Sequence, residues 1–257
     1  MEPLSISQVE QQLRAMNVRE GAVLLVHTSY RAVRPIEGGP RGLIEALRGA
    51  LGPRGTLVMP SWTGDDNALF DPLATPAAAD LGVVAEQFWR LPDVVRSHHF
   101  QAFAAWGPQA NFVTEGPLPI PPHIPASPVG RVHELDGQVL LLGVGHDANT
   151  TLHLAELMAG VPYRTPGSGL VLRDGRPERI EYEENDHCCQ RFVLVDEWLR
   201  NRGLQTEGIV GHARARLARS RDIVDVSLEN LARDPLVFLH SLEDGCEECN
   251  SARASIR

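Results

Sequence analysis

His153 and Glu156 are the pair in this sequence whose types and spacing best suit acid–base chemistry. They stand in TTLHLAELMAG, directly after the strongly apolar stretch 137–145. If a helix begins at Asn149 or Thr150, His153 falls in its first turn, where the positive end of the helix dipole disfavours an imidazolium ion. A neutral ring there is a candidate general base. Glu156 shares the same helix face and either orients the ring or completes the helix surface, and a structural role for His153 is the alternative.

A second constellation is made of cysteines and one histidine. His187-Cys188-Cys189 and Cys246-x-x-Cys249 supply enough sulfur and nitrogen ligands for a closed tetrahedral zinc site. We expect the ligands to be His187, Cys188, Cys246 and Cys249, with Cys189 as the alternative to Cys188. Four protein ligands leave no open position, so this zinc ion would be structural, and buried free thiols are the competing interpretation. Zinc hydrolases of the HExxH type need two histidines one helical turn apart, and His153 and Glu156 have no second histidine at that spacing.

Polar residues follow three of the apolar stretches that have the length of a strand. These residues are His27-Thr28-Ser29, then Ser61-Trp62 with Asp65 and Asp66, and finally the segment 146–153. In open α/β sheets ligands bind beyond the carboxyl ends of the strands, so we expect the three segments to converge on one site. The alternative for the serines and threonines is that they cap the helices that follow. Glycine-rich nucleotide motifs and the GxSxG elbow are absent, which disfavours dinucleotide-binding, P-loop and α/β-hydrolase functions.

The elements that must position these residues alternate between strands and helices. Apolar runs without alternation predict strands at 22–29, 56–62, 103–107 and 137–145, and helical patterns lie at 42–55, 81–92 and 150–160. This order predicts an α/β fold with a mixed, largely parallel central sheet covered by helices. From about residue 161, two alternating stretches around Arg173-Asp174-Gly175-Arg176 predict an antiparallel hairpin, and 190–203 and 208–232 have a helical pattern. We expect one domain over 1–257, with a core of 1–160 and a C-terminal subregion of 161–257.

Composition limits the partners of the protein. The net charge is −9, and all 24 cationic side chains are arginines. An acidic surface disfavours nucleic acids and anionic membranes, and it suits a polycationic small molecule. The N-terminal residues lack the features of a signal peptide, and the four cysteines are clustered, so we expect reduced thiols and a cytoplasmic location. Both a monomer and a homodimer are compatible with the sequence.

Several long motifs resemble the aminoglycoside 3-N-acetyltransferase family, which is distinct from the GNAT acetyltransferases. They are LLVHTS, RSHHF, IPASPVGRVHELDGQVLLLGVGHDANTTLHLAE and EYEENDHCC, and the resemblance extends from about residue 5 to the last cysteines. It is strongest to the broad-spectrum branch that accepts apramycin as well as gentamicin-type drugs. The resemblance implies the antibiotic N-acetyltransferase fold. It also implies acetyl transfer from acetyl-CoA to the 3-amino group of 2-deoxystreptamine, which confers resistance.

The resemblance also implies roles for single residues. His153 would be the general base, Glu184 and Asp186 would bind the cationic drug and orient the histidine, and Asp66 would be a further acidic contact. Coenzyme A would be held by His27, Thr28, Ser29, Arg96, Ser97 and Ser127. The loop at Asp65 and Asp66 varies in length within the family, so its match is less secure. Two alternatives remain, an acetyltransferase acting on another metabolic amine and a protein that binds aminoglycosides without turnover.

Overall fold

A seven-stranded mixed sheet forms the centre of the computed structural model, which describes residues 2–173 and 175–256. The strand order is β3-β4-β2-β1-β5-β9-β8. The strands are β1 (Val23–Thr28), β2 (Thr56–Pro60), β3 (Val95–Arg96), β4 (Phe103–Trp106), β5 (Gln138–Leu142), β8 (Gln205–Val210) and β9 (Ala213–Arg219). Strand β1 pairs in parallel with β2 and β5, and the outer pairs are antiparallel. The mixed α/β architecture predicted from the sequence is confirmed, with parallel pairing confined to the three central strands.

The central strands are apolar throughout because both faces of the sheet are covered. Leu24 and Val26 of β1 belong to one buried cluster, and Val23 and Leu25 belong to the other. Successive side chains of a strand point to opposite faces, so a strand buried on both sides must be apolar at every position. This is why the sequence shows continuous apolar runs here and no alternation.

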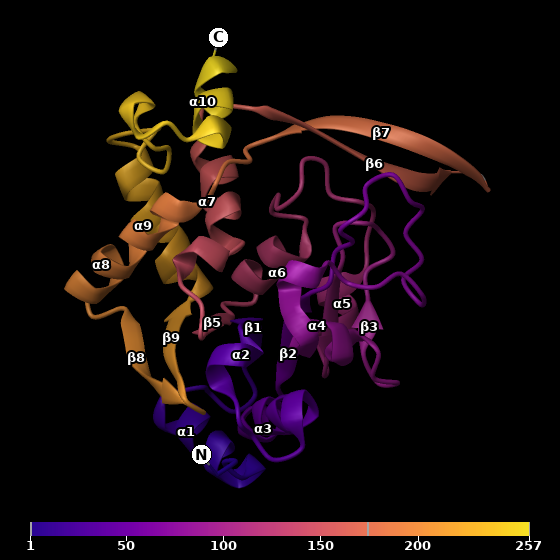
Figure 1. Cartoon of the computed structure of the whole chain (residues 1–257), viewed down its shortest axis with the longest axis vertical. Coiled ribbons are helices and arrows are strands. Elements are labelled where there is room, and N and C mark those ends of the chain that lie inside the picture. The colour runs from indigo at the N-terminus through magenta and orange to yellow at the C-terminus, as the bar shows by residue number, and fades with distance from the viewer. Residues whose placement is uncertain (1, 174, 257) are drawn as a thin grey trace.

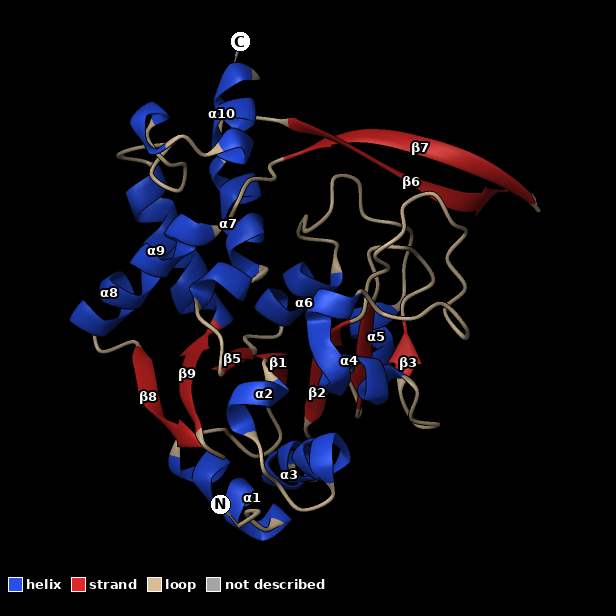
Figure 2. Cartoon of the chain, viewed as in Figure 1, coloured by secondary structure: helices blue, strands red, loops and turns tan. Residues whose placement is uncertain are grey.

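Helices cover the two faces of the sheet (Figure 2). One cluster contains residues of α1 (Ile6–Ala15), α3 (Gly39–Leu51) and α4 (Gly82–Trp89). The other contains residues of α5 (Ala110–Thr114), α6 (Pro128–Glu134), α7 (Thr151–Ala159), α8 (Leu194–Asn201), α9 (Ser220–Leu231) and α10 (Glu247–Ala254). The shorter helical segments are α2 (Tyr30–Val33), η1 (Ala79–Leu81), η2 (His146–Ala148), η3 (Gln190–Val193) and η4 (Leu242–Asp244). Within the described part of the chain, no helix is long and apolar enough to cross a membrane.

The predicted hairpin after residue 161 is confirmed. Strands β6 (Thr165–Arg173) and β7 (Arg176–Glu184) pair in antiparallel register from Thr165↔Glu184 to Arg173↔Arg176. Asp174, which the sequence places in the turn, lies outside the described residues. The hairpin extends from the side of α7 and α10 across the loops above α4, α5 and α6 (Figure 1). Glu184, at its end, is thereby brought back toward the central sheet.

One predicted helix is partly wrong. The pattern over 208–232 predicts a helix throughout, but its first part lies in the antiparallel pair β8–β9, and only Ser220–Leu231 is helical. Ala213, Ala215 and Leu217 of β9 are buried, with the arginines between them more exposed. Strand β9 pairs with β5 on one side and with β8 on the other, and these tertiary contacts outweigh the helix propensity of alanine and arginine.

Candidate active site

A cavity of about 590 Å³ opens at the carboxyl ends of β1, β2 and β5. The three strand-end segments expected from the sequence all contribute to its wall. Their lining residues include His27, Thr28, Pro60, Trp62, Asp66, Asn149, Thr150 and His153. The segment after β7 adds Glu184, Asp186, Cys188 and Cys189. The convergence predicted from the strand ends is therefore confirmed, and the hairpin supplies the remaining wall.

His153 occupies the position in α7 that the sequence predicts. The helix begins at Thr151 with Thr150 as its N-cap, so His153 lies in the first turn. Its Nδ1 donates a hydrogen bond to Oε2 of Glu156 at 3.0 Å. In the neutral ring this bond places the proton on Nδ1 and the lone pair on Nε2, which lies 3.4 Å from Sγ of Cys189. Of the two roles left open for Glu156, orientation of the histidine ring is the one that the structure shows.

Glu156 is a fully buried carboxylate held by four donors. Besides His153, it accepts hydrogen bonds from Nε2 of His187 at 2.8 Å, from Nδ2 of Asn185 at 3.1 Å and from the hydroxyl of Tyr163. Burial opposes its charge, but the bonds to His153 and His187 prevail and lower its pKa to about 2. The three extra donors were not predicted, because nothing in their local sequence indicates that they meet α7.

The expectation that the helix dipole keeps His153 neutral is wrong. Burial favours the neutral ring, yet Cys189 and Glu156 outweigh it and raise the pKa of His153 well above its ordinary value of 6.5. A helix end carries about half an elementary charge, whereas Glu156 places a full carboxylate charge 3.0 Å from the ring. His153 is therefore a stronger base than an isolated imidazole, held in place by a buried anion.

His123 and Phe192 complete the surroundings of the histidine ring. His123 stacks on His153 with ring centroids 5.3 Å apart, and Phe192 meets it edge-on at 5.1 Å. Burial, together with repulsion from His153, lowers the pKa of His123 to about 3, so His123 stays uncharged. His123 was missed by sequence reasoning because it lies in a proline-rich loop at a positive φ of 65°, without any regular pattern.

Five acidic residues line the cavity, and Asp66, Glu184 and Asp186 are three of them, with Asp80 and Asp147 as the others. Burial raises the pKa of Glu184 to about 7, and the negative charge of Asp186 adds to this effect. Burial also raises the pKa of Asp66, with Asp65 as the next contribution. Carboxylates that repel one another in a partly buried wall gain stability when cations approach them. The structure thus brings together the three acidic residues that were expected to contact a cationic ligand.

The residues expected to hold coenzyme A fall into two groups. His27 and Thr28 line the cavity, and Oγ1 of Thr28 is a buried hydroxyl oxygen without a hydrogen-bond partner among the described residues. Ser29, Arg96, Ser97 and Ser127 are not part of the cavity wall. Ser29 is the N-cap residue of α2, and Ser127 caps α6 by accepting a hydrogen bond from the Gly130 backbone.

Arg96 and Ser97 are buried, and both form hydrogen bonds with other residues of the protein. Arg96 donates to the carbonyl of Thr75 at 2.6 Å and to Oγ of Ser61 at 3.2 Å. Ser97 bonds to the backbone of Phe103. Arg96 thereby anchors the loop that follows β2 and carries Asp66. Its contacts, like those of Ser97, are structural, and a direct contact of either with coenzyme A stays a prediction.

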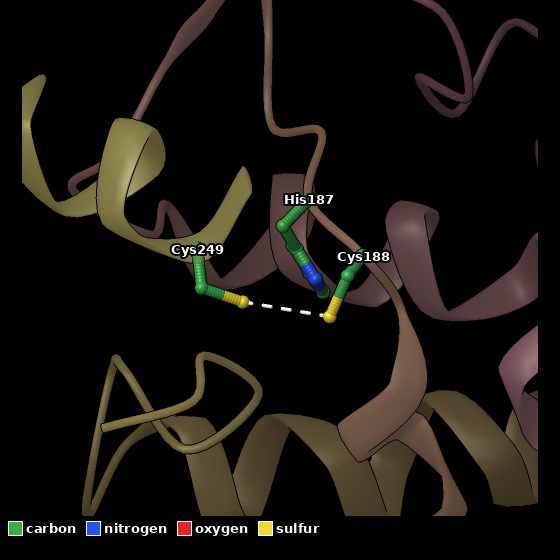
Figure 3. A group of neighbouring side chains, drawn as sticks. All are labelled: His187, Cys188 and Cys249. Carbon is green, nitrogen blue, oxygen red and sulfur yellow. Dashed lines mark hydrogen bonds between the residues drawn. The ribbon is translucent and has the colours of Figure 1, made fainter. Parts of the chain in front are cut away.

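Three of the expected zinc ligands, His187, Cys188 and Cys249, lie close together (Figure 3). Sγ of Cys188 is 3.6 Å from Sγ of Cys249, and Cys246 interacts with both thiols. His187, Cys188 and Cys249 present ligand atoms within 4.8 Å of one another. Both ring nitrogens of His187 already have partners, because Nε2 bonds to Glu156 and Nδ1 accepts a hydrogen bond from the Cys189 backbone at 3.1 Å. Glu248, with Cys188 and Cys246, forms a second group of the same compactness.

Comparison with known proteins agrees with this geometry. A family model described as aminoglycoside 3-N-acetyltransferase matches residues 25–232. Aminoglycoside N(3)-acetyltransferase IV of Salmonella sp is 65% identical over 234 residues, which cover 91% of this chain and 90% of that protein. A crystal structure of a histidine-to-alanine variant of aminoglycoside acetyltransferase AAC(3)-IVa in complex with a gentamicin matches with a TM-score of 0.98. It is 62% identical and covers 100% of this chain and 99% of that one.

The same variant has also been crystallised in complex with apramycin. This structure matches with a TM-score of 0.92 and 60% identity, covering 97% of this chain and 99% of that one. The chain therefore belongs to the aminoglycoside 3-N-acetyltransferase family, as its motifs predict.

Proposed function

We propose that the protein transfers the acetyl group of acetyl-CoA to the 3-amino group of 2-deoxystreptamine aminoglycosides, with apramycin and gentamicin-type drugs among its substrates. The observation that carries this proposal is the pairing of His153 with Glu156 at the wall of a cavity that is also lined by Asp66, Glu184 and Asp186. Relatives with 60% and 62% identity have been crystallised with apramycin and with a gentamicin, respectively. Acetylation removes a positive charge from the drug, and resistance follows from weaker binding to its target.

The acidic wall supplies affinity for the acceptor. Aminoglycosides carry several ammonium groups, and charge-assisted hydrogen bonds from ammonium to carboxylate are about twice as strong as neutral ones. Asp66, Glu184 and Asp186 present such acceptors from two different segments of the chain. Binding of a polycation relieves the repulsion that raises the pKa of Glu184. In this way the cavity favours a cationic sugar over a neutral one.

The histidine supplies the proton transfer. Nε2 of His153 accepts a proton from the attacking 3-amino group, while Glu156 holds the Nδ1–H and stabilises the imidazolium that forms. The amine nitrogen attacks the thioester carbonyl, the carbon–sulfur bond breaks, and coenzyme A leaves as its thiol. General-base catalysis of this kind contributes about 10²–10⁴-fold to a rate. Proximity of the two bound substrates contributes further.

The donor thioester fits the part of the cavity at the end of β1. Thr28 lines the cavity, and its Oγ1 is a buried oxygen without a hydrogen-bond partner among the described residues, which a bound ligand would supply. His27 lies next to it, bonded to Thr150 through Nε2 at 3.3 Å. We assign the donor contact to Thr28, with His27 as its support. Ser29, Arg96, Ser97 and Ser127 then shape the site from outside the cavity.

A direct assay tests the proposal. Purified protein is incubated with acetyl-CoA and either apramycin or gentamicin, the released thiol of coenzyme A is measured, and the drug is analysed by mass spectrometry. We expect thiol release together with one added acetyl group, and we expect His153→Ala to abolish both. Tight drug binding by calorimetry without acetylated product would instead favour the non-catalytic binding protein. A higher kcat/KM for an unrelated amine would favour a metabolic acetyltransferase.

A structural zinc ion in the thiol cluster (Cys188, Cys246 and Cys249) is a separate part of the proposal. Tetrahedral zinc with Zn–S bonds of about 2.3 Å separates two sulfur ligands by roughly 3.8 Å, close to the 3.6 Å between Cys188 and Cys249. The fourth ligand is either His187, as expected from the sequence, or Glu248. His187 would first have to give up one of its two present hydrogen bonds, to Glu156 or to the Cys189 backbone. Metal analysis of protein purified without added metal tests this, and Cys246→Ser is expected to remove the zinc and lower the melting temperature.

The clustered thiols are expected to stay reduced in the cytoplasm, where we place the enzyme.

A further inference from the structure

A second group of potential metal ligands lies in the active site itself. Nε2 of His153, a carboxylate oxygen of Asp186 and Sγ of Cys189 are all within 4.8 Å of one another. All three residues line the cavity, whereas the thiol cluster takes only Cys188 from that wall. The proposed acetyl transfer forms no bond to Cys189, which affects it only through the pKa of His153. We call His153, Asp186 and Cys189 the pocket triad.

The distances within the pocket triad match those of a zinc centre. Zn–N bonds of about 2.0 Å and Zn–S bonds of about 2.3 Å place the two ligand atoms roughly 3.5 Å apart in a tetrahedral site. Nε2 of His153 and Sγ of Cys189 are 3.4 Å apart. Nδ1 of His153 donates a hydrogen bond to Glu156. In metal sites, such a carboxylate fixes the orientation of the histidine ring and leaves the other ring nitrogen free to bind the metal. His187 differs, because both of its nitrogens are bonded.

We propose that the pocket triad is an inhibitory zinc site. Zinc bound to Nε2 of His153, Sγ of Cys189 and Asp186 has three protein ligands, with its fourth position open to the cavity. Binding releases to solvent the thiol proton of Cys189 and, from the protonated ring, the Nε2 proton of His153, and zinc then occupies the lone pair of Nε2. The ion also places two positive charges where the acidic wall receives an ammonium group. Zinc and the aminoglycoside therefore exclude each other.

The inhibition rests on the proposed function of His153 as the base, whereas the binding of zinc does not. Kinetics and metal binding are therefore measured separately. Initial rates of apramycin acetylation are recorded at graded concentrations of zinc for wild type, Cys189→Ser and the matched control Cys246→Ser. We expect inhibition of wild type to be competitive with apramycin. Each protein is compared with its own rate without zinc, because Cys189 also raises the pKa of His153. Cys189→Ser is expected to need at least about tenfold more zinc for half-inhibition. Tenfold is the lower end of the affinity loss caused by removing a residue that only orients a metal ligand.

Cobalt(II) reports on binding without any turnover, because cobalt bound to a thiolate has a charge-transfer absorption. In the Cys246→Ser background, which disables the thiol cluster, we expect a residual absorption that apramycin suppresses and that an added Cys189→Ser change removes. Cys189→Ala serves as a second variant in case the serine perturbs folding. If cobalt binds in this way but no variant acetylates apramycin, the metal site stands and the proposed function fails.

Three results would overturn the metal site. The first is equal inhibition of wild type and Cys189→Ser by zinc, since sulfur would then contribute nothing. The second is loss of inhibition in Cys246→Ser with no effect in Cys189→Ser, which would assign the effect to the thiol cluster. Inhibition that is competitive with acetyl-CoA and indifferent to apramycin would also contradict it, because the pocket triad lies among the acidic residues.

Discussion

Glu156 determines where the candidate base lies. It is buried without exposure to solvent, and it satisfies donors from four residues at once. A glutamine there keeps one accepting oxygen but adds an NH2 group that faces donors. The buried polar network would then be only partly satisfied, which is costly where the effective dielectric constant is low.

For Glu156→Gln we expect kcat for apramycin to fall by roughly 10²-fold or more, as happens when the carboxylate that orients a catalytic histidine becomes an amide. KM for acetyl-CoA is expected to change little. Tyr163→Phe is the control, because it removes one donor to Glu156 and leaves the bond to His153 intact. Steady-state kinetics measure both. An unchanged kcat in Glu156→Gln would show that the carboxylate does not position the base.

We expect Glu184 to give the binding of the drug a dependence on pH. Its pKa is raised to about 7 by burial and by Asp186, so the carboxyl group loses its negative charge as the pH falls through about 7. The groups that act on it are Asp186, His153 and Asp66. Protonation of His153 at low pH adds positive charge and acts in the same direction on a cationic ligand.

We expect KM for apramycin to rise as the pH is lowered from about 8 to about 6, because Glu184 becomes neutral over this range. Glu184→Gln should have a raised KM at the higher pH and a flatter pH profile, and the difference between the two profiles isolates Glu184 from His153. Parallel profiles in the two proteins would contradict the assignment. KM for acetyl-CoA serves as the internal control.

At the scale of elements, the β6–β7 hairpin positions the acidic wall. Arg179 on β7 donates to Oδ1 of Asn67 at 2.8 Å, which ties the hairpin to the loop that carries Asp66. On β6, Gly169 packs against the ring of Phe100, and a Cβ added there would lie 2.5 Å from the ring atoms. The hairpin and the loops beneath it are therefore in tight contact at a point where a side chain has no room.

Gly169→Ala is expected to push the hairpin away from Phe100 and to raise KM for apramycin several-fold, with a smaller effect on KM for acetyl-CoA. The double variant Gly169→Ala with Phe100→Leu makes space for the methyl group and should recover much of the loss. The two KM values, measured for the single and double variants, test this. A failure of Phe100→Leu to restore binding would indicate that the glycine acts in another way.

At the scale of the whole molecule, stability depends on the sheet that both clusters share. Leu140 lies in β5, at 0% exposure, between β1 and β9. Leu172, on the hairpin, is 65% exposed. Truncation of each leucine to alanine removes the same atoms, once from the core and once from the surface.

Leu140→Ala is expected to lower the free energy of unfolding by about 2–5 kcal/mol, because it loses buried apolar area and leaves a cavity. Leu172→Ala should change it by less than about 0.5 kcal/mol. Urea unfolding followed by fluorescence measures both. Similar shifts in the two variants would mean that the central sheet does not dominate stability.

The sequence by itself determined the elements with strong local patterns. The apolar runs at β1, β2 and β5, the start of α7 and the β6–β7 hairpin were all predicted, and so was the convergence of His27, Asp66 and His153 at one sheet edge. These follow from periodicity and from the rule that parallel strands end at the same edge. The β8–β9 pair was missed because alanine and arginine favour helices, whereas its conformation depends on an edge supplied by β5.

Only the tertiary structure decided which side chains meet at the site. Glu156 contacts Asn185 and His187, about thirty residues away, and Cys188 contacts Cys249 across 61 residues. Such contacts depend on the order of strands and on the return of the chain after the hairpin, which no local pattern encodes. The same contacts reversed the expected charge preference of His153, because a nearby carboxylate acts more strongly than a helix end. The sequence thus indicated the candidate base, and the fold determined its surroundings.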